Sequence, residues 1–243
     1  MKKLITLSLL PMALLSAADA AIVANQTIGI DFGTAAPAGA TTFNQFDAHN
    51  NVIADAGTLA FSALGINSGA LKDTANADVT GVGFVVTNNT GWATGNANVT
   101  TGAEGAGLMT DSSVYSDTII SNNASGHVIA AGAHFLFTFT GLDDSLTYDL
   151  TGGFDNNNNN FDATWSVGAQ GSFTTDLTAS VGYGTITGLT TDGFGNIEIK
   201  VQENSLHVVA GALTLTAVPE PSSYALIAGA FALTSIMVRR RRS

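Results

Sequence analysis

Apolar and polar residues alternate along much of the chain, and a period of two predicts β-strands that bury one face. In residues 134–140 three phenylalanines, Phe135, Phe137 and Phe139, fall on one face, and threonines lie on the other. The same alternation recurs in residues 146–151, 163–167 and 197–202 and at Leu213 and Leu215. Further strand candidates are residues 27–32, 58–66, 81–87 and 114–121. Each large apolar side chain buried by these strands is expected to contribute about 1.5–3 kcal/mol.

Turn residues separate these segments at short intervals. Residues 141–145 (GLDDS) are predicted to form a hairpin between the strands on either side, and residues 192–196 form a glycine-containing turn before the next strand. The body shows no convincing helical period, although residues 54–64 are ambiguous. Many short strands joined by glycine-rich turns predict an all-β fold, and we expect a single β-sandwich domain.

The turn at 141–145 also carries a distinctive spacing of residues. Gly141, Leu142, Asp143, Ser145 and Tyr148 follow the pattern G-L-D-x-S-x-x-Y. With its flanking strands, this segment resembles the strand–turn–strand of galactose-binding-like jelly-roll domains, which occur in secreted bacterial proteins. The resemblance implies a jelly-roll-like sandwich. It implies sugar binding less directly, because one fold carries many functions.

The N-terminal segment has the three parts of a secretory signal peptide. Lys2 and Lys3 form a charged region, an apolar stretch covers residues 4–15, and Ala18 and Ala20 form an A-x-A cleavage site. The expected cut follows Ala20. An apolar helix this short does not span a bilayer of about 30 Å, which favours a cleaved signal helix over a retained anchor.

The C-terminal segment combines three parts in a fixed order. The stiff tripeptide Pro219, Glu220 and Pro221 comes first, an apolar stretch covers residues 224–238, and four arginines follow: Arg239, Arg240, Arg241 and Arg242. Because arginine is costly to move across hydrocarbon, an inserted apolar helix keeps this cluster on the cytoplasmic side. A helix of about 15 residues spans only about 22 Å, so we expect a marginal and temporary anchor.

This whole segment resembles the PEP-CTERM sorting signal of Gram-negative bacteria. The resemblance implies that an exosortase, a membrane-embedded protease, recognises the Pro-Glu-Pro motif and releases or transfers the body. It also implies an association with exopolysaccharide. We therefore expect a signal peptide at 1–20, a β-sandwich body at 21–217 and a sorting signal with a short hydrophobic helix at 218–243. The expected route is export, transient anchoring in the inner membrane, and arrival at the cell surface or extracellular matrix.

Removal of both signals leaves a strongly acidic body. Six of the eight basic residues lie in the signals, and only Lys72 and Lys200 remain. Of the 19 acidic residues, only Asp19 and Glu220 leave with the signals, so the body has 17 acids and a formal charge of −15. Binding to nucleic acid or anionic lipid depends on lysine and arginine, and we expect neither as a partner of the body.

Two observations bear on metals and cofactors. The chain has no cysteine, which excludes disulfides, thiol nucleophiles and cysteine-ligated metal sites. Residues 155–162 (DNNNNNFD) are rich in the oxygen ligands that calcium prefers. An EF-hand is rejected, because Asn160 stands where glycine is required and Ser166 where glutamate is required. A looser Ca²⁺ site with Asp155 and Asp162 and a solvated polar loop both stay open, and no other cofactor is expected.

Aromatic residues are the other candidates for ligand binding. Trp92 lies in a polar, glycine-containing context that favours an exposed loop, where a flat ring could stack on a sugar. Trp165 is in phase with Ala163 and Val167 and is expected in the core.

No catalytic constellation is visible, so we do not expect an enzyme. A structural or adhesive matrix protein is favoured over a carbohydrate-binding module of jelly-roll type, and both over a glycan hydrolase.

Overall fold

The computed structural model describes residues 22–32, 43–46, 57–60, 71–88, 92–96, 117–121, 132–153, 162–176, 182–204, 208–219 and 231. Apart from the isolated Phe231, these residues form strands and the turns between them, which confirms the all-β prediction for the described part of the chain. None of the helical structure described is long and apolar enough to cross a bilayer. The expected signal helix at 1–20 and the arginine cluster lie outside the described residues.

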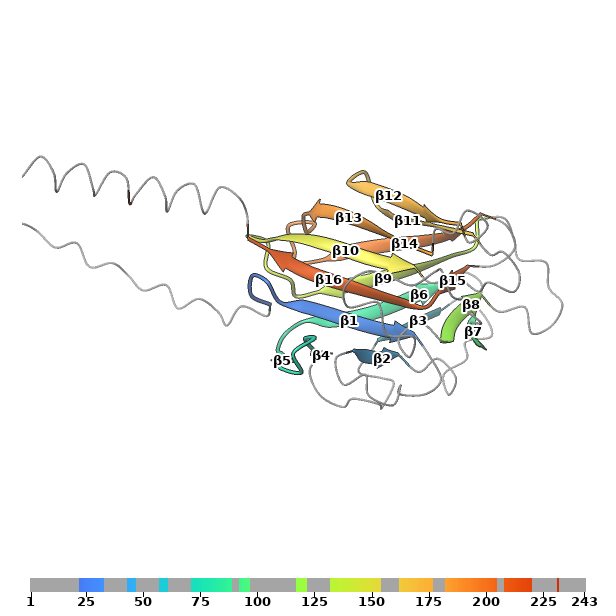
Figure 1. Ribbon diagram of the computed structural model, residues 1–243, viewed down its shortest axis with the longest axis horizontal. Coiled ribbons are helices and arrows are strands. Elements are labelled where there is room, and N and C mark those ends of the chain that lie inside the picture. The colour runs from blue at the N-terminus through green and yellow to red at the C-terminus, as the bar shows by residue number, and fades with distance from the viewer. Residues whose placement is uncertain are drawn as a thin grey trace, which may run out of the picture.

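Two large sheets contain most of the strands (Figure 1). The five-stranded sheet has the spatial order β13 (Tyr183–Leu189), β10 (Thr147–Gly153), β16 (Ala212–Val218), β1 (Thr27–Phe32) and β2 (Asn44–Phe46). The six-stranded sheet has the order β12 (Gly171–Thr175), β11 (Ala163–Val167), β14 (Ile197–Glu203), β9 (His134–Thr140), β6 (Gly83–Asn88) and β3 (Gly57–Ala60). Except for the parallel pair β1 and β2, neighbouring strands in both sheets are antiparallel.

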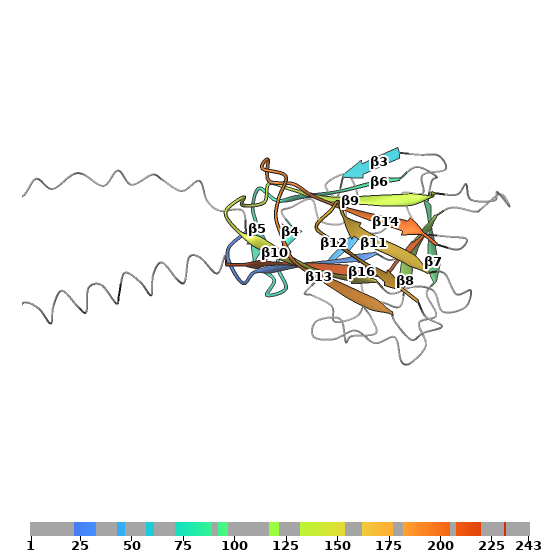
Figure 2. The same cartoon turned by 90° about the horizontal axis from the view of Figure 1, so that it is seen from above.

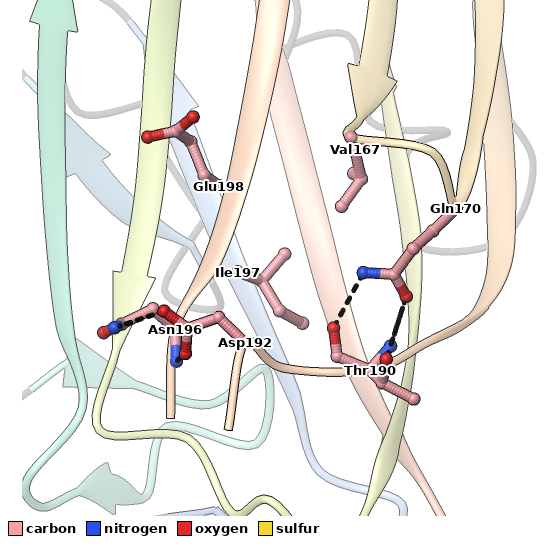
Figure 3. Close-up of a pocket in the computed structure, with 8 residues that line it drawn as sticks. Val167, Gln170, Thr190, Asp192, Asn196, Ile197 and Glu198 are labelled. Carbon is pink, nitrogen blue, oxygen red and sulfur yellow. Dashed lines mark hydrogen bonds between the residues drawn. The ribbon is translucent and has the colours of Figure 1, made fainter. Parts of the chain in front are cut away.

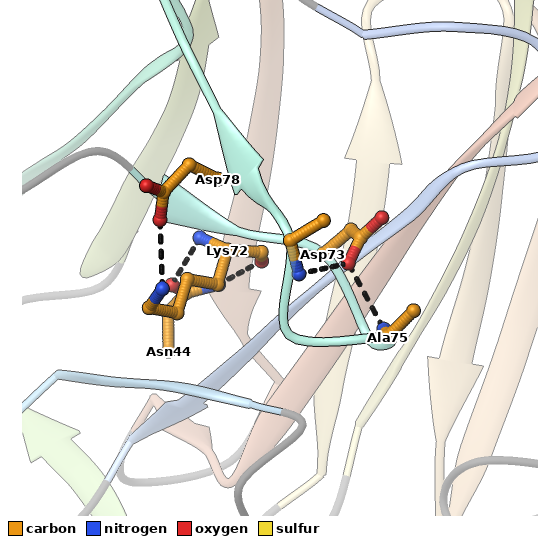
Figure 4. Close-up of polar contacts among 6 residues, drawn as sticks. Asn44, Lys72, Asp73, Ala75 and Asp78 are labelled. Carbon is orange, nitrogen blue, oxygen red and sulfur yellow. Dashed lines mark hydrogen bonds and ion pairs between the residues drawn. The ribbon is translucent and has the colours of Figure 1, made fainter.

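Two smaller sheets complete the described structure. One has the order β15 (Val209–Ala210), β8 (Asp117–Ser121) and β7 (Trp92–Asn96). The other is a ribbon of β4 (Leu71–Lys72) and β5 (Asp78–Val79). The Asn44 side chain joins this ribbon to the five-stranded sheet, since it donates to the Gly29 and Lys72 carbonyls and accepts from the Lys72 amide (Figure 4).

Four of the strand pairs in the two large sheets are nested in sequence. β1 pairs with β16, β9 with β14, β10 with β13, and β11 with β12, so each pair encloses the next along the chain. Successive pairs alternate between the five-stranded and the six-stranded sheet. This is the pairing of one long hairpin folded over on itself, with β11 and β12 at its closed end. The first and last strands of the body therefore meet in the middle of one sheet.

The two large sheets lie one over the other (Figure 2), and aromatic rings from both contact each other in the buried core. Phe32 of β1 stacks on Phe137 of β9 with ring centroids 4.7 Å apart, and Phe46 of β2 meets Phe84 of β6 edge to face at 6.1 Å. All four rings are at most 1 % exposed. Such ring pairs contribute about 0.5–1.5 kcal/mol beyond the apolar area that they bury. They fix how the two sheets face each other.

Large side chains on one sheet lie against glycines on the other. Trp165 and Phe173, on neighbouring strands of the six-stranded sheet, stack with centroids 5.7 Å apart. A Cβ atom added to Gly152 would lie 2.7 Å from the Trp165 ring, and one added to Gly184 would lie 2.3 Å from Phe173. The glycines are therefore required for close approach of the sheets. The prediction that Trp165 belongs to the core is confirmed, since it is fully buried.

The predicted hairpin at residues 141–145 is wrong. β9 pairs with β14 and β6, whereas β10 pairs with β13 and β16, so this turn carries the chain from one large sheet to the other. Gly141 has φ of 72°, and a Cβ there would lie 2.1 Å from the Gly81 carbonyl oxygen, which no side chain tolerates. Turn composition does not distinguish a hairpin from a crossover, because both need the same local backbone geometry.

Hydrogen bonds of the Tyr148 hydroxyl stabilise this crossover. Its ring is fully buried, its hydroxyl donates to the Asp143 carbonyl at 3.0 Å, and it accepts from the Asp143 amide at 2.9 Å. The Asp143 carboxylate in turn accepts from the amide and hydroxyl of Ser145. Burial raises the pKa of Tyr148 to about 12, against the ordinary value of 10.0. The G-L-D-x-S-x-x-Y spacing therefore encodes a crossover fixed by its own side chains.

Replacement of Tyr148 by phenylalanine tests this role. Tyr148→Phe leaves the Asp143 amide without its partner, while the Asp143 carbonyl keeps the hydrogen bond from the Leu146 amide, and we expect a loss of about 1–3 kcal/mol in the free energy of unfolding. Denaturant unfolding at neutral pH measures the loss. Thr187→Ala, at an exposed position of β13, is the control and should change stability by less than about 0.5 kcal/mol.

The same variant changes the dependence of stability on pH. Between pH 10.0 and about 12 the unfolded chain loses the Tyr148 proton while the folded chain keeps it. Stability from this group is therefore intact below pH 10 and falls as the pH rises toward 12. In Tyr148→Phe this part of the alkaline loss should disappear. An unchanged alkaline slope would contradict the assignment.

Candidate functional site at the loop between β13 and β14

Several loops meet at the end of the domain where β16 finishes. Tyr148 pairs with Leu189 and Thr147 with Val218, so the ends of β13 and β16 lie on either side of the start of β10. Ile197, at the start of β14, pairs with Phe139 near the end of β9. The loop between β13 and β14 and the turn between β9 and β10 therefore share this end with the start of β1 and the end of β16.

Asp192 closes the loop between β13 and β14. Its amide donates to the Asn196 carbonyl at 2.9 Å, and its carboxylate accepts from the amides of Phe194 and Asn196 and from the Asn196 side chain. Gly193 and Gly195 supply the positive φ angles, 83° and 75°, that this tight turn requires. The Asn196 side chain and then the Phe194 amide lower the pKa of Asp192, so its carboxylate is charged at neutral pH.

The loop is also fastened to the crossover turn. The Asp144 carboxylate accepts from the Gly195 amide at 2.9 Å and from the Thr191 hydroxyl. The Leu142 amide donates to the Gly195 carbonyl at 2.9 Å. Asp144 thus has partners in another loop, while Asp143 binds within its own turn, and the two carboxylates do not act as a pair. These contacts hold the loop in one conformation.

Phe194 stands at the tip of this fastened loop. It is 85 % exposed, the most exposed large apolar side chain of the described residues. Isolated apolar residues on a surface are ordinary. Phe194 differs because the backbone on both of its sides is fixed by the bonds of Asp192 and Asp144. A rigid loop therefore presents a full aromatic ring to the solvent.

A shallow depression of about 190 Å³ lies beside the loop (Figure 3). The side chains of Val167 and Ile197 lie between two polar groups of residues, with Gln170 and Thr190 on one side and Asp192 and Asn196 on the other. Gln170 binds Thr190 through three hydrogen bonds: its side-chain amide donates to the Thr190 carbonyl, and its side-chain oxygen accepts from the Thr190 amide and hydroxyl. Glu198 completes the lining as an exposed carboxylate on β14.

The expectation of a loop at Trp92 is wrong. Trp92 is the first residue of β7 and pairs with Ser121 of β8. Its neighbours in the strand, including Gly95 and Asn96, have low β-propensity, which is why the segment suggested a loop. The strand is held by pairing with β8, whose Ile119 and Ile120 favour extended structure. A role for Trp92 in sugar stacking stays a prediction.

The predicted calcium site has one of its two carboxylates, Asp162, among the described residues. Asp155 lies outside the described residues, and Asp162 directly precedes β11. Burial, and then the charge of Asp176, raises the pKa of Asp162. Asp176 is close because Ala163 pairs with Thr175, which places the two acids across from each other. No group of three or more His, Cys, Asp or Glu that could hold a metal ion occurs among the described residues, and calcium binding stays a prediction.

The residues of the predicted processing signals are mostly outside the described ranges. Pro219 is described and follows the last residue of β16. The others lie outside: Ala18, Ala20, Glu220, Pro221, Arg239, Arg240, Arg241 and Arg242. Of the two lysines of the body, Lys72 forms an ion pair of 2.7 Å with Asp78 on the surface (Figure 4) and does not line the depression. Such exposed pairs contribute little to stability.

The coupling of Asp162 to Asp176 can be measured directly. Asp176→Asn removes the like charge, so the pKa of Asp162 should fall but stay above its ordinary 3.8, because burial, the larger cause, remains. A carboxyl-carbon NMR titration reports it. Asp78→Asn, which changes an acid paired with Lys72 instead, is the matched control and should leave the pKa of Asp162 unaltered. An unaltered pKa in Asp176→Asn would show that the two carboxylates are not coupled.

Sequence reasoning missed Phe194 because a turn of sequence DGFGN predicts backbone shape and says little about its central side chain. The sequence signal for this side chain is a large apolar residue between two glycines, outside the alternation that starts at Ile197.

Comparison of the chain with protein-family models, with curated proteins and with solved structures finds no match.

Proposed function

We propose that the body is a β-sandwich of the jelly-roll type. The support is the nested pairing of β1 with β16, β9 with β14, β10 with β13 and β11 with β12, with successive pairs in opposite sheets. A jelly roll is formed by such wrapping of antiparallel strands into two facing sheets. The ring contacts between Phe32 and Phe137 and between Phe46 and Phe84 support the facing of the sheets.

The protein is exported and sorted by an exosortase through residues 218–243. One observation carries this proposal: strand pairing ends at Val218, next to the first residue of the Pro219, Glu220 and Pro221 motif. Val218 pairs with Thr147, and Pro219 has no amide hydrogen with which to continue a ladder. The sorting segment is thus attached directly to the last strand. A marginal anchor followed by cleavage would release the body without opening its sheets.

The N-terminal cut fits the same arrangement. Ile22 is fully buried, and the Asn25 amide donates to the Ala217 carbonyl at 2.7 Å. A cut after Ala20 leaves one residue, Ala21, before this buried position, so all the described residues from Ile22 onward stay with the body. The described residues next to the two proposed signals, Ile22 and Pro219, belong to the same end of the domain, where Asn25 bonds to Ala217 and Thr27 pairs with Thr216. The anchored intermediate therefore presents this end to the membrane, and the opposite end projects away from it.

At its destination the body acts as a structural or adhesive component associated with exopolysaccharide. Its partners are the sorting protease, the inner membrane during anchoring, and extracellular polysaccharide. The body's 17 acids against two lysines support an extracellular polymer over nucleic acid or anionic lipid. A carbohydrate-binding module is the second candidate, favoured by the exposed ring of Phe194 on a loop whose Asp192 and Asn196 line a depression. A glycan hydrolase has less support, because the Asp143 and Asp144 carboxylates accept structural hydrogen bonds from the Ser145 and Gly195 amides and do not act as a catalytic pair.

Deletion of residues 219–243 tests the sorting proposal. Because β16 stays complete, the truncated body should fold, and it should be exported but absent from the surface fraction. Cell fractionation with an antibody against the body measures this. Replacement of Pro219 and Pro221 by alanine in the full chain is a matched control that removes the motif and keeps the apolar stretch; it should leave the protein in the membrane fraction. Unchanged surface localisation of the truncated chain would refute the proposal.

A further inference from the structure

The depression is lined by Asp192 and Asn196 of the loop that carries Phe194, and it has the composition of a site for a sugar ring. Val167 and Ile197 supply apolar groups to its lining, and the residues on either side of them supply amide, hydroxyl and carboxylate groups. Ligand sites commonly combine an apolar surface with a few placed polar groups. Sugars match this pairing, because a pyranose has faces of C–H groups and a rim of hydroxyls. The exposed ring of Phe194 adds an aromatic face on which C–H groups can stack.

The charges of the site select the class of sugar. Asp192 and Glu198 line the depression, and none of its lining residues is a lysine or an arginine. The bonds from Asn196 and Phe194 keep the Asp192 carboxylate charged. Carboxylates accept hydrogen bonds from sugar hydroxyls or amines, whereas a uronate or a sulfated sugar would bring like charges together. An acidic polysaccharide is therefore disfavoured at this surface.

We infer that the depression lined by Gln170, Asp192 and Glu198, together with Phe194, binds an uncharged or amine-bearing sugar unit of an extracellular polysaccharide. This inference rests on the proposed function and names the surface that contacts the polymer. The loop is fixed before binding by Asp144 and Asp192, so little conformational entropy is lost when the sugar is bound. The same bonds place the ring and the carboxylates in a constant arrangement.

The size of the site sets the expected mode of binding. A depression of about 190 Å³ is smaller than the roughly 300–1,000 Å³ of a typical pocket for a small molecule, so it fits one ring of a polymer. Binding of one unit is weak, and retention by a polymer depends on many repeated units near each protein molecule. Because the site shares its end with Val218, it faces the membrane while the anchor is in place. Release by the sorting protease turns it toward the polymer.

Co-sedimentation of the full chain, purified in detergent, with three insoluble polysaccharides tests the inference. The probes are cellulose, which is neutral, chitosan, which carries amines, and calcium-cross-linked alginate, which is acidic. The full chain should sediment with cellulose or chitosan and much less with alginate. Phe194→Ala should lower the retained affinity about fivefold, the equivalent of about 1 kcal/mol of lost stacking. Glu198→Gln should weaken binding to chitosan and reduce the discrimination against alginate.

Two controls separate binding from folding. Thr187→Ala, exposed on β13 and absent from the lining, should bind like the unchanged chain. Phe194→Ala removes no buried contact, so its melting temperature should be unchanged.

Retention that is equal in Phe194→Ala, Glu198→Gln and the unchanged chain would overturn the site while leaving the proposed function intact. Preference of the unchanged chain for alginate, or no retention on any probe, would also overturn it. Export and sorting are then decided separately by the localisation of the truncated chain.

Discussion

The insertion of β16 between β1 and β10 is the contact on which the rest of the structure depends. It joins the last strand of the body to the first, across nearly the whole described chain, with Thr27 opposite Thr216 and Ile30 opposite Leu213. The same strand pairs on its other edge with β10, from Thr147 to Gly153. Only after this strand is in place does the five-stranded sheet have a continuous face to cover the rings of the other sheet.

This one placement also determines where the functional features lie. Because β16 runs antiparallel to β1, the body begins and ends at the same end of the domain. The Asp192–Asn196 loop and the crossover at Asp143 lie there too, tied to each other through Asp144. In the function proposed above, sorting and polymer contact would therefore use the same end of the domain. The acidic character of this end, from Asp143, Asp144 and Asp192, suits a partner without negative charge.

Local alternation was enough to predict many strands but not their partners. Residues 27–32, 134–140 and 163–167 were predicted as strands with the bounds that β1, β9 and β11 have, because side chains with a period of two determine a strand by themselves. The hairpin at 141–145 was wrong because pairing depends on residues far away in the chain. The tyrosine that fixes the crossover could be seen in the sequence as a motif, while its bonds to Asp143 could not.

The candidate site was harder to predict than the fold. Phe194 is one of 13 phenylalanines, and most of those described are buried, so its type alone indicated nothing about exposure. The depression arises from the turn after β11 and the loop after β13, which meet only when the two sheets are assembled. The polar neighbours of Trp92 predicted an exposed loop, but pairing with β8 places Trp92 in a strand.

The most direct test of the account is a cross-link between the first and last strands. The chain has no cysteine, and the hydroxyl oxygens of Thr27 and Thr216 lie 2.8 Å apart, so a Thr27→Cys and Thr216→Cys double variant carries the only two thiols. Oxidation of the folded full chain should give an intramolecular disulfide in high yield, seen as a mobility shift that reductant reverses. Free thiols, or disulfides only between molecules, would contradict the pairing of β1 with β16.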